Sequence, residues 1–442
     1  MTTVGSITGS SIERRDITPI TIPNDSEDEL CTSDFDHSGA NIDDTLKRIK
    51  VAVIGTGYVG LHLVNAFSPA YDVIAFDISE SRVAEVKQSV GKRVACTTDQ
   101  RLLSQATHFL IAVSTVLDSQ GHIDTSCLQK AIMMLEEHAP PGTTVVIESS
   151  VAVGMTRDLL EPLMRSKNLK CGMSPERGDP GRTYPHYSTI PKIVSGLNSD
   201  SLQSIHALHS RVFENIVPVT TPEVAEMTKL YENCQRMMCI AYVNEMAGAC
   251  NQLSKTLSSK TSRSVDIDPF EVCQAAATKP FGYLPFTPSL GVGGHCIPVN
   301  PYYMLSNCDF PPLKSCTQRM ADRPARMGDR IMSQLRSHRR PRILVVGLGF
   351  KRGQSVLSNS PGKALAIHLL STYDVYVQYA DPWVAESGAP FIPRLDESVD
   401  WNVKHLQQFA AIVVAVNQPG LDLQVLQEGE SKGVHVEWFC PS

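Results

Sequence analysis

The stretch that decides the fold is RIKVAVIGTGYVGLHLVNAF, residues 48–67. It begins with an apolar run typical of a buried strand, passes through a glycine-rich turn, and continues with apolar residues at helical spacing. Gly55, Gly57 and Gly60 form a G-x-G-x-x-G pattern, and Asp77 ends the next apolar run, YDVIAFD at 71–77. This order predicts a strand–turn–helix unit that binds a dinucleotide.

Three glycines and one acid have distinct roles in a site of this kind. Gly55 permits the tight turn, Gly57 lets the backbone approach a pyrophosphate at the helix N-terminus, and Gly60 permits close helix packing. An acid at position 77 accepts hydrogen bonds from the ribose hydroxyls of NAD and repels a 2′-phosphate. The alternative is a glycine turn that serves only helix packing.

Apolar runs and helical segments alternate on both sides of a long helical stretch. Before about residue 220 we expect strands in THFLIAVST (107–115) and TTVVIESS (143–150), and helices in ESRVAEVKQSV (80–90) and CLQKAIMMLEEH (127–138). A second such stretch begins at PRILVVGLGF (341–350) and continues with VYVQYADP (375–382), AAIVVAVN (410–417) and a helix starting at Ser360-Pro361. Alternation of this kind predicts doubly wound parallel sheets.

The middle of the chain has a different character. PEVAEMTKLYENCQRMMCIAYVNEMAGACNQLSKTL (222–257) predicts one long helix, a spine between domains or a dimer contact. A further helix is expected after Asp268, a plausible cap before Pro269. Residues 279–303 contain five Pro and four Gly and are expected to form a loop.

We therefore predict an α/β protein with two Rossmann-like doubly wound domains joined by a central helical domain. The expected boundaries are an acidic disordered tail at 1–46, an NAD-binding domain at 47–220, a central domain at 221–330 and a second Rossmann-like domain at 331–442. The tail is rich in Ser, Thr, Asp and Glu and has no sustained apolar periodicity.

Composition excludes several classes of function. The 442 residues carry 40 Lys and Arg against 46 Asp and Glu, which gives no general attraction to nucleic acid or an anionic membrane. No apolar run reaches the length of a spanning helix, and no secretory signal is recognised, so we expect a cytoplasmic protein. The 12 cysteines include no C-x-x-C pair, which argues against a zinc site and favours reduced thiols.

Cys296 lies in GVGGHCIP (291–298), where three glycines precede a thiol. Such a loop is expected where the backbone passes close to a ligand and presents a nucleophile. A cysteine thiolate attacks carbonyl carbons. The alternative is a buried structural cysteine.

Four blocks resemble a known family: VIGTGYVG (53–60), SPERGDPG (174–181), EMTKLYENCQRMMCIAYVNE (226–245) and GVGGHCIPVNPYY (291–303). From about Arg48 to about Pro382 the chain resembles the NAD-dependent nucleotide-sugar 6-dehydrogenases of the UDP-glucose/GDP-mannose dehydrogenase family. It looks most like the branch that acts on UDP-N-acetylhexosamines. SPERGDPG favours that branch, since UDP-glucose enzymes usually continue Pro-Glu-Phe-Leu.

The resemblance implies oxidation of a primary alcohol to a carboxylate in two hydride transfers, through a thiohemiacetal and a thioester on Cys296. Lys229 and Asn233 share a helix face and would stabilise the alkoxide and the oxyanion. Glu176 would handle the hydrolytic water, which Ser150 would hold. The alternative for Lys229 and Asn233 is that they lie on an exposed helix face and have no catalytic role. The alternative for Glu176 is that it is a loop acid that caps Arg177.

The resemblance also implies three sets of site residues, and no metal. The catalytic set is Cys296, Lys229, Asn233, Glu176, Ser150 and Asn300. The NAD-binding set is Gly55, Gly57, Tyr58, Val59, Gly60, Asp77, Arg82, Thr115 and Ser150. The substrate-binding set is Glu176, Arg177, Lys229, Asn233, Phe281, Gly282, Tyr283, Gly293 and Lys351.

Departures from the family pattern bear on activity. Asn300 stands where the family has an acid four residues after the cysteine, and an amide cannot accept a proton. In FKRGQSVLSNSPG (350–362), Val356 and Ser358 replace an Asp and an Arg, although Lys351 remains. In a smaller change, Val113-Ser114-Thr115-Val116 replaces a common Pro-Thr-Pro variant.

Three hypotheses follow. The first is an active nucleotide-sugar 6-dehydrogenase, a homodimer or higher oligomer built on the long helix. The second is a catalytically impaired homologue that binds NAD and the nucleotide sugar. The third is a single-hydride 3-hydroxyacid dehydrogenase, which has no use for the Gly-Gly-His-Cys loop.

Overall fold

The computed structural model describes residues 49–117, 123–178, 186–261 and 263–441. Its first sheet has eight strands in the order β10-β9-β8-β7-β4-β1-β2-β3. These strands are β1 (Lys50–Ile54), β2 (Asp72–Phe76), β3 (Val94–Thr97), β4 (His108–Ile111), β7 (Thr144–Ile147), β8 (Lys170–Met173), β9 (Lys192–Gly196) and β10 (Ile216–Pro218). The helices connected with it are α2 (Tyr58–Phe67), α3 (Glu80–Ser89), α4 (Ser126–His138), α5 (Met155–Lys167) and α6 (Ser199–His209).

The apolar runs of the central strands are continuous because both faces of the sheet are covered. Along β1, Val51 and Val53 belong to one hydrophobic core, and Ala52 and Ile54 belong to the other. A parallel sheet covered by helices on both faces requires this pattern. The strands expected around residues 50, 72, 108 and 144 are therefore confirmed.

One strand pair departs from the all-parallel expectation. β8 and β9 are antiparallel, whereas the other pairs of this sheet are parallel. A parallel return needs a crossover, usually a helix, but the described residues between β8 and β9 contain only the 3₁₀ turn η2 (Tyr187–Thr189). This connection carries Glu176 at the carboxyl end of β8.

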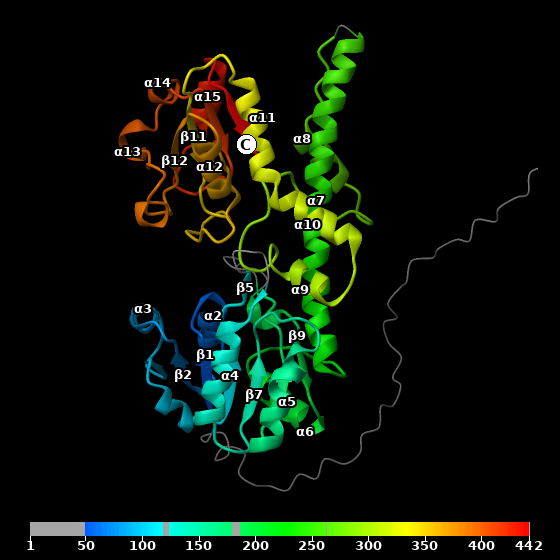
Figure 1. Cartoon of the computed structure of the whole chain (residues 1–442), viewed down its shortest axis with the longest axis vertical. Coiled ribbons are helices and arrows are strands. Elements are labelled where there is room, and N and C mark those ends of the chain that lie inside the picture. Colours follow the sequence, from blue (N-terminus) through cyan, green and yellow to red (C-terminus); the bar gives the residue numbers. More distant parts are fainter. Residues whose placement is uncertain (1–48, 118–122, 179–185, 262, 442) are drawn as a thin grey trace, which may run out of the picture. The chain divides into compact units, whose positions relative to one another are not determined.

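The long helix is confirmed as α7 (Pro222–Thr261), about 60 Å long at 1.5 Å per residue. The helices that follow are α8 (Pro269–Ala277), α9 (Asn300–Asn307), α10 (Pro311–Ala321) and α11 (Arg323–Gln334). α9 and α10 pack along α7 (Figure 1). Asp268 caps α8 as expected, accepting a hydrogen bond from the Phe270 N–H at 2.9 Å. The expected loop at 279–303 is too long, because α9 already begins at Asn300.

The second sheet is parallel and has four strands in the order β12-β11-β13-β14. They are β11 (Arg342–Val346), β12 (Tyr376–Ala380), β13 (Ala411–Val414) and β14 (Val436–Trp438). The helices are α12 (Pro361–Thr372), α13 (Glu397–Asp400), α14 (Val403–Leu406) and α15 (Gln424–Ser431). The smaller elements of the chain are the antiparallel pair β5 (Val116–Leu117) and β6 (Ile123–Asp124), and the 3₁₀ turns η1 (Gln100–Gln105) and η3 (Glu386–Gly388).

The α/β class, with two parallel-type sheets and a long central helix, is confirmed. The domain boundaries at 46, 220 and 330 stay predictions, and the tail at 1–46 lies outside the described residues. Among the described residues, no helix combines the length and the apolar character that a bilayer span requires.

Candidate active site

The glycine turn between β1 and α2 leaves room for a ligand at one position only. A Cβ atom on Gly60 would lie 1.8 Å from the Gly55 carbonyl oxygen, and one on Gly55 would lie 2.9 Å from the Ala112 oxygen. A Cβ on Gly57 would meet nothing within 4 Å. Gly57 is also the N-cap of α2 and supplies no capping side chain. The turn therefore fits a dinucleotide pyrophosphate approaching beside Gly57.

Asp77 is fixed at the carboxyl end of β2. Its Oδ2 accepts hydrogen bonds from the N–H and the hydroxyl of Thr56, at 2.8 and 3.1 Å, and its Oδ1 accepts from the Ser79 N–H at 3.0 Å. A carboxylate oxygen accepts two hydrogen bonds, so Oδ1 retains capacity for a ribose hydroxyl. Arg82 donates to the Thr56 carbonyl at 2.7 Å and pairs with Glu85 at 2.6 Å. These internal contacts compete with any use of Arg82 for a 2′-phosphate.

Replacing Asp77 by Asn should weaken NAD binding about 10- to 100-fold, the value of one charged hydrogen bond to the ribose. It should also narrow the preference for NAD over NADP. Isothermal titration with both nucleotides measures the two changes. Asp72→Asn, at the exposed opposite end of β2, is the matched control and should leave both affinities unchanged. Equal NAD affinity in Asp77→Asn and the parent would show that Asp77 does not bind the ribose of NAD.

The glycine turn of the second sheet has no comparable room. A Cβ on Gly349 would lie 2.4 Å from the Gln354 carbonyl oxygen and 2.8 Å from Nε2 of Gln418. Asp381, at the position equivalent to Asp77, is fully buried and accepts from the Gly349 N–H at 2.9 Å and from Gln418 at 3.2 Å. The chain itself thus fills the pyrophosphate position. Lys351 lies in the same turn, after β11.

Lys229 and Asn233 lie on the buried face of α7. They are 8% and 6% exposed, so the exposed-face alternative is wrong. The Lys229 ammonium donates to the Glu176 carbonyl oxygen at 2.5 Å. The Asn233 amide donates to the side-chain oxygen of Asn300, which is itself 1% exposed.

The first turn of α7 is anchored to the first sheet's helices. Glu226 accepts from the N–H groups of Gly154 and Thr156 at 2.6 and 2.8 Å, at the start of α5. The Arg157–Glu223 ion pair at 2.7 Å lies beside it. These contacts fix the register of Lys229, one turn further along α7, relative to the carboxyl edge of the sheet.

The cysteine loop is joined to the same cluster through the start of α9. The Cys296 carbonyl accepts from the Asn300 N–H at 2.9 Å, so the half-buried cysteine lies one turn before Asn300. The glycines also serve packing within the chain, and a ligand contact at this loop stays a prediction. A Cβ on Gly293 would lie 2.7 Å from the Phe350 Cβ, and one on Gly294 would lie 2.9 Å from a carbon of the Phe350 ring. The glycines therefore let the loop pack against the chain itself.

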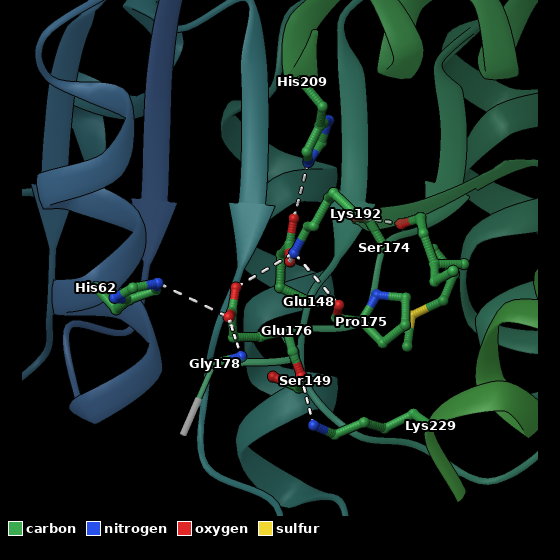
Figure 2. Close-up of polar contacts among 12 residues, drawn as sticks. His62, Glu148, Ser149, Ser174, Pro175, Glu176, Gly178, Lys192, His209 and Lys229 are labelled. Carbon is green, nitrogen blue, oxygen red and sulfur yellow. Dashed lines mark hydrogen bonds and ion pairs between the residues drawn. The ribbon is translucent and has the colours of Figure 1, made fainter. Parts of the chain in front are cut away.

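Glu176 lies in a cluster of charged groups, which Figure 2 shows. Its carboxylate accepts from the Gly178 N–H at 2.6 Å and from Lys192 at 3.3 Å, and His62 lies 3.8 Å away. Burial alone would raise the pKa of Glu176. Lys192, His62, the Gly178 hydrogen bond and Lys229 outweigh burial and lower the pKa to about 2. Glu176 is therefore a carboxylate throughout the neutral range.

The structure brings together part of the remaining predicted set. The Thr115 hydroxyl donates to the Ser150 carbonyl at 3.1 Å, joining the carboxyl ends of β4 and β7. Arg177 pairs with Glu232 at 2.6 Å and not with Glu176, so Glu176 is not a cap for Arg177. The residues from 281 to 283 are not joined to the Asn233–Asn300 cluster in the described chain. There Phe281 is exposed, while Gly282 and Tyr283 line an apolar cavity of about 660 Å³ along α7.

Sequence reasoning missed the residues behind Glu176: Lys192, Glu148, His209 and His62. Glu148 did carry a signal, because it directly follows the buried strand β7, where parallel-sheet sites form. Lys192 opens a strand, where a lysine is usually exposed, and His209 ends an amphipathic helix. Neither position differs in sequence from an ordinary surface residue.

Comparison with known proteins agrees with this geometry. Residues 86–217 match the UDP-glucose/GDP-mannose dehydrogenase family NAD-binding domain, and residues 223–314 match the family's central domain. The UDP-N-acetyl-D-glucosamine 6-dehydrogenase of Pseudomonas aeruginosa is 30% identical over 377 residues, 78% of this chain and 85% of that protein. The UDP-N-acetyl-D-mannosamine dehydrogenase of Pyrococcus horikoshii is 28% identical, over 75% and 84% of the two chains.

Among solved structures, a UDP-glucose dehydrogenase from Pyrobaculum islandicum has the same fold, with a TM-score of 0.76. It is 18% identical and covers 90% of this chain and 99% of that one. A match to the family's NAD-binding domain, on a fold of this kind, defines an NAD-binding dehydrogenase. The chain belongs to the UDP-glucose/GDP-mannose dehydrogenase family and is a nucleotide-sugar dehydrogenase of that family.

Proposed function

We propose that the chain oxidises the C6 alcohol of a UDP-N-acetylhexosamine to the uronate. The observation that carries this proposal is a pair of contacts one turn apart on α7: Asn233 binds Asn300, which follows the Cys296 turn, and Lys229 binds Glu176. These contacts join three segments that are distant in sequence. They supply a thiol, donors for an oxyanion and a carboxylate, as a two-step oxidation through a thioester requires. The relatives that act on UDP-N-acetylhexosamines favour that substrate class.

Two hydride transfers and one hydrolysis convert the C6 alcohol to the carboxylate in the proposed reaction. NAD, when bound at the glycine turn, accepts a hydride in each of two rounds. In the first round the alcohol loses a proton and becomes an aldehyde, and the Cys296 sulfur adds to its carbon to form a thiohemiacetal. The second round removes the remaining hydride and the hydroxyl proton, leaving a thioester. Water then adds to the carbonyl carbon, the C–S bond breaks, and the carboxylate and the free thiol are released with one proton.

Lys229 and Asn233 keep spare donors for this chemistry. An ammonium has three hydrogens and an amide has two, while each side chain uses one in the contacts described above. The remaining N–H groups can stabilise the alkoxide of the first step and the oxyanion that precedes C–S cleavage. A positive charge and an amide dipole, held rigidly on α7, suit that role.

The stoichiometry of the reaction tests this proposal. With a panel of UDP-sugars, we expect two NADH per sugar consumed for a UDP-N-acetylhexosamine and much slower turnover of UDP-glucose. One NADH per sugar would instead indicate a simple alcohol dehydrogenase. No turnover with any UDP-sugar would disprove the proposal.

A second candidate function is a nucleotide-sugar-binding homologue with impaired catalysis. The observation that favours it is the buried Asn300, whose side-chain oxygen is engaged by Asn233 and which cannot act as a base. Tight binding of NAD and the UDP-sugar without NADH formation, together with activity restored by Asn300→Asp, would identify this function.

We further propose that the chain forms a homodimer through α7. One face of this helix carries exposed apolar side chains at Tyr231, Tyr242, Met246, Leu253 and Leu257. The spacings of 4, 7 and 4 residues from Tyr242 onward match a continuous helical stripe. A second copy of the chain would remove this stripe and the adjoining apolar cavity from water.

Tyr242→Asp should therefore convert the dimer to a 48.4 kDa monomer, since loss of a central interface tyrosine costs about 2 kcal/mol, or about 30-fold in Kd. Sedimentation equilibrium measures the mass. Met133→Asp changes a similarly exposed apolar residue on α4 and should leave the dimer intact. A parent protein that sediments as a monomer would contradict the proposal.

A further inference from the structure

A run of buried charged groups extends from Glu176 into the interior of the first sheet (Figure 2). Lys192 opens β9, Glu148 follows β7 and His209 ends α6, and their side chains are 2%, 0% and 0% exposed. The Lys192 ammonium lies 2.6 Å from Oε2 of Glu148 and 3.3 Å from Oε2 of Glu176. His209 Nε2 lies 3.1 Å from Oε1 of Glu148.

The contacts of His209 show that the Glu148–His209 pair holds one proton. Nδ1 lies 2.9 Å from the Ile205 carbonyl oxygen, which can only accept, so Nδ1 carries a hydrogen. An unprotonated Nε2 and a carboxylate oxygen are both acceptors. Their contact therefore requires a proton between them, whichever atom carries it. The pair as a whole is neutral.

The proton shared by Glu148 and His209 affects the charge balance around Lys192. Because His209 already compensates the negative charge of Glu148, Glu148 cancels only part of the positive charge of the Lys192 ammonium. The ammonium has three hydrogens and three acceptors: Glu148, Glu176 and, at 3.3 Å, the Pro175 carbonyl. The Phe213 ring lies 5.4 Å from it. Lys192 is thus buried and held between the two carboxylates, closer to Glu148 and within hydrogen-bond distance of Glu176.

Besides the Gly178 N–H, which donates to Oε1 of Glu176 at 2.6 Å, two further side chains face Glu176, and neither donates a hydrogen bond to its carboxylate. His62 on α2 is 3.8 Å away, beyond hydrogen-bond distance, and its Nε2 has no hydrogen-bond partner in the described chain. Lys229 on α7 binds the Glu176 backbone carbonyl and not its carboxylate. Lys192 therefore supplies the only side-chain hydrogen bond to the Glu176 carboxylate among the described residues.

We propose that Lys192, backed by the Glu148–His209 pair, is a positioning residue for thioester hydrolysis, holding Glu176 as an oriented anion that accepts a hydrogen bond from the attacking water. This inference rests on the proposed function. The water oxygen bonds to the thioester carbon and the electron pair of the C–S bond goes to sulfur. One water proton ends on the thiol, and the proton of the new acid passes to solvent. Glu176 orients this water and does not store its proton.

The test is Lys192→Met, which removes the charge and keeps the length of the side chain. Without Lys192, the strongest of the groups that oppose the effect of burial is lost, so the pKa of Glu176 should rise. The slow hydrolysis phase should then gain an acid limb, with the rate falling about tenfold for each pH unit below the raised pKa. NADH formation in the first turnover should stay within about twofold of the parent, since Lys192 does not touch the reacting atoms.

Two further variants make the test specific. Lys170→Met, at the exposed first residue of the neighbouring strand β8, should behave as the parent. Lys192→Arg should restore a hydrolysis rate without the acid limb. If Lys192 had only a structural role, Lys192→Met would slow first-turnover NADH formation and hydrolysis equally, and the hydrolysis rate would gain no new fall at low pH. That result would overturn the proposal.

An NMR titration of ¹³C-labelled glutamate carboxyls reads the same effect without turnover. The Glu176 signal, identified by its loss in Glu176→Gln, should not titrate between pH 5 and 8 in the parent. In Lys192→Met it should titrate in that range. A parent Glu176 that titrates near neutral pH would overturn the proposal even if Lys192→Met does not fold. If no UDP-sugar is oxidised, the proposed function fails, while this measurement still decides whether Lys192 holds Glu176 as an anion.

Discussion

Replacing Cys296 by Ala is expected to abolish uronate formation, lowering its rate by about 10³-fold or more. Without the sulfur the aldehyde has no covalent anchor, so neither the thiohemiacetal nor the thioester can form. Binding of NAD should be unchanged, because the glycine turn and Asp77 lie in the first sheet domain. Quantification of the uronate and of NADH in the same sample measures both oxidation steps.

Cys308→Ala is the matched control for this experiment. Cys308 is an exposed thiol at the other end of α9, and its loss should leave the rate unchanged. If Cys296→Ala formed uronate at even a tenth of the parent rate, the sulfur would not be the nucleophile.

The second large effect is expected in the hydrolysis of the thioester. Asn300 cannot accept a proton, and Glu176, with its pKa lowered to about 2, is a weak base. The parent should therefore show a burst of NADH followed by slow turnover, with thioester accumulating on Cys296. Asn300→Asp should speed the slow phase about 10-fold or more and leave the burst nearly unchanged. Glu176→Gln should slow it about 10²-fold, because a neutral amide oxygen replaces the charged acceptor of the water's hydrogen bond.

Stopped-flow absorbance of NADH separates the two phases. Asn244→Asp controls for the effect of introducing a carboxyl group at a buried, hydrogen-bonded asparagine. Asn244 is a fully buried residue of α7 whose side chain accepts a hydrogen bond from the Ser289 N–H. This variant should not speed hydrolysis. Traces without a burst, or an Asn300→Asp variant no faster than the parent, would show that the water step is solved without a base at position 300.

Much of the fold could be predicted because its signals are local. The strands around Val51, Phe109 and Val145 are continuous apolar runs, and α7 is a helical pattern without internal proline. The antiparallel pairing of β9 could not be predicted, because it depends on the absence of a crossover helix and not on the strand's own residues. The start of α9 at Asn300 was hidden by the prolines around it.

The same distinction between local and long-range signals applies to the residues of the site. Gly57 and Asp77 sit in a fixed local pattern, and the structure gives the open space and the oriented carboxylate that the pattern predicts. The glycines at 293 and 294 predict a close ligand, and the structure adds close packing against Phe350, more than 50 residues later, which the sequence does not indicate. The place of Lys192 and His209 in the site can be recognised only in the folded chain, where three strands and a helix bring them next to Glu148 and Glu176. Long-range packing of this kind leaves no periodic trace in one sequence.

The central claim is a covalent intermediate on Cys296, and the mass of the quenched protein tests it most directly. The protein is mixed with NAD and UDP-N-acetylglucosamine or UDP-N-acetylmannosamine, acid-quenched during the slow phase, and digested for mass spectrometry. We predict an acyl adduct of the sugar nucleotide on the peptide containing Cys296, and its absence from Cys296→Ala. Turnover to the uronate with unmodified Cys296 at every quench time would contradict the claim.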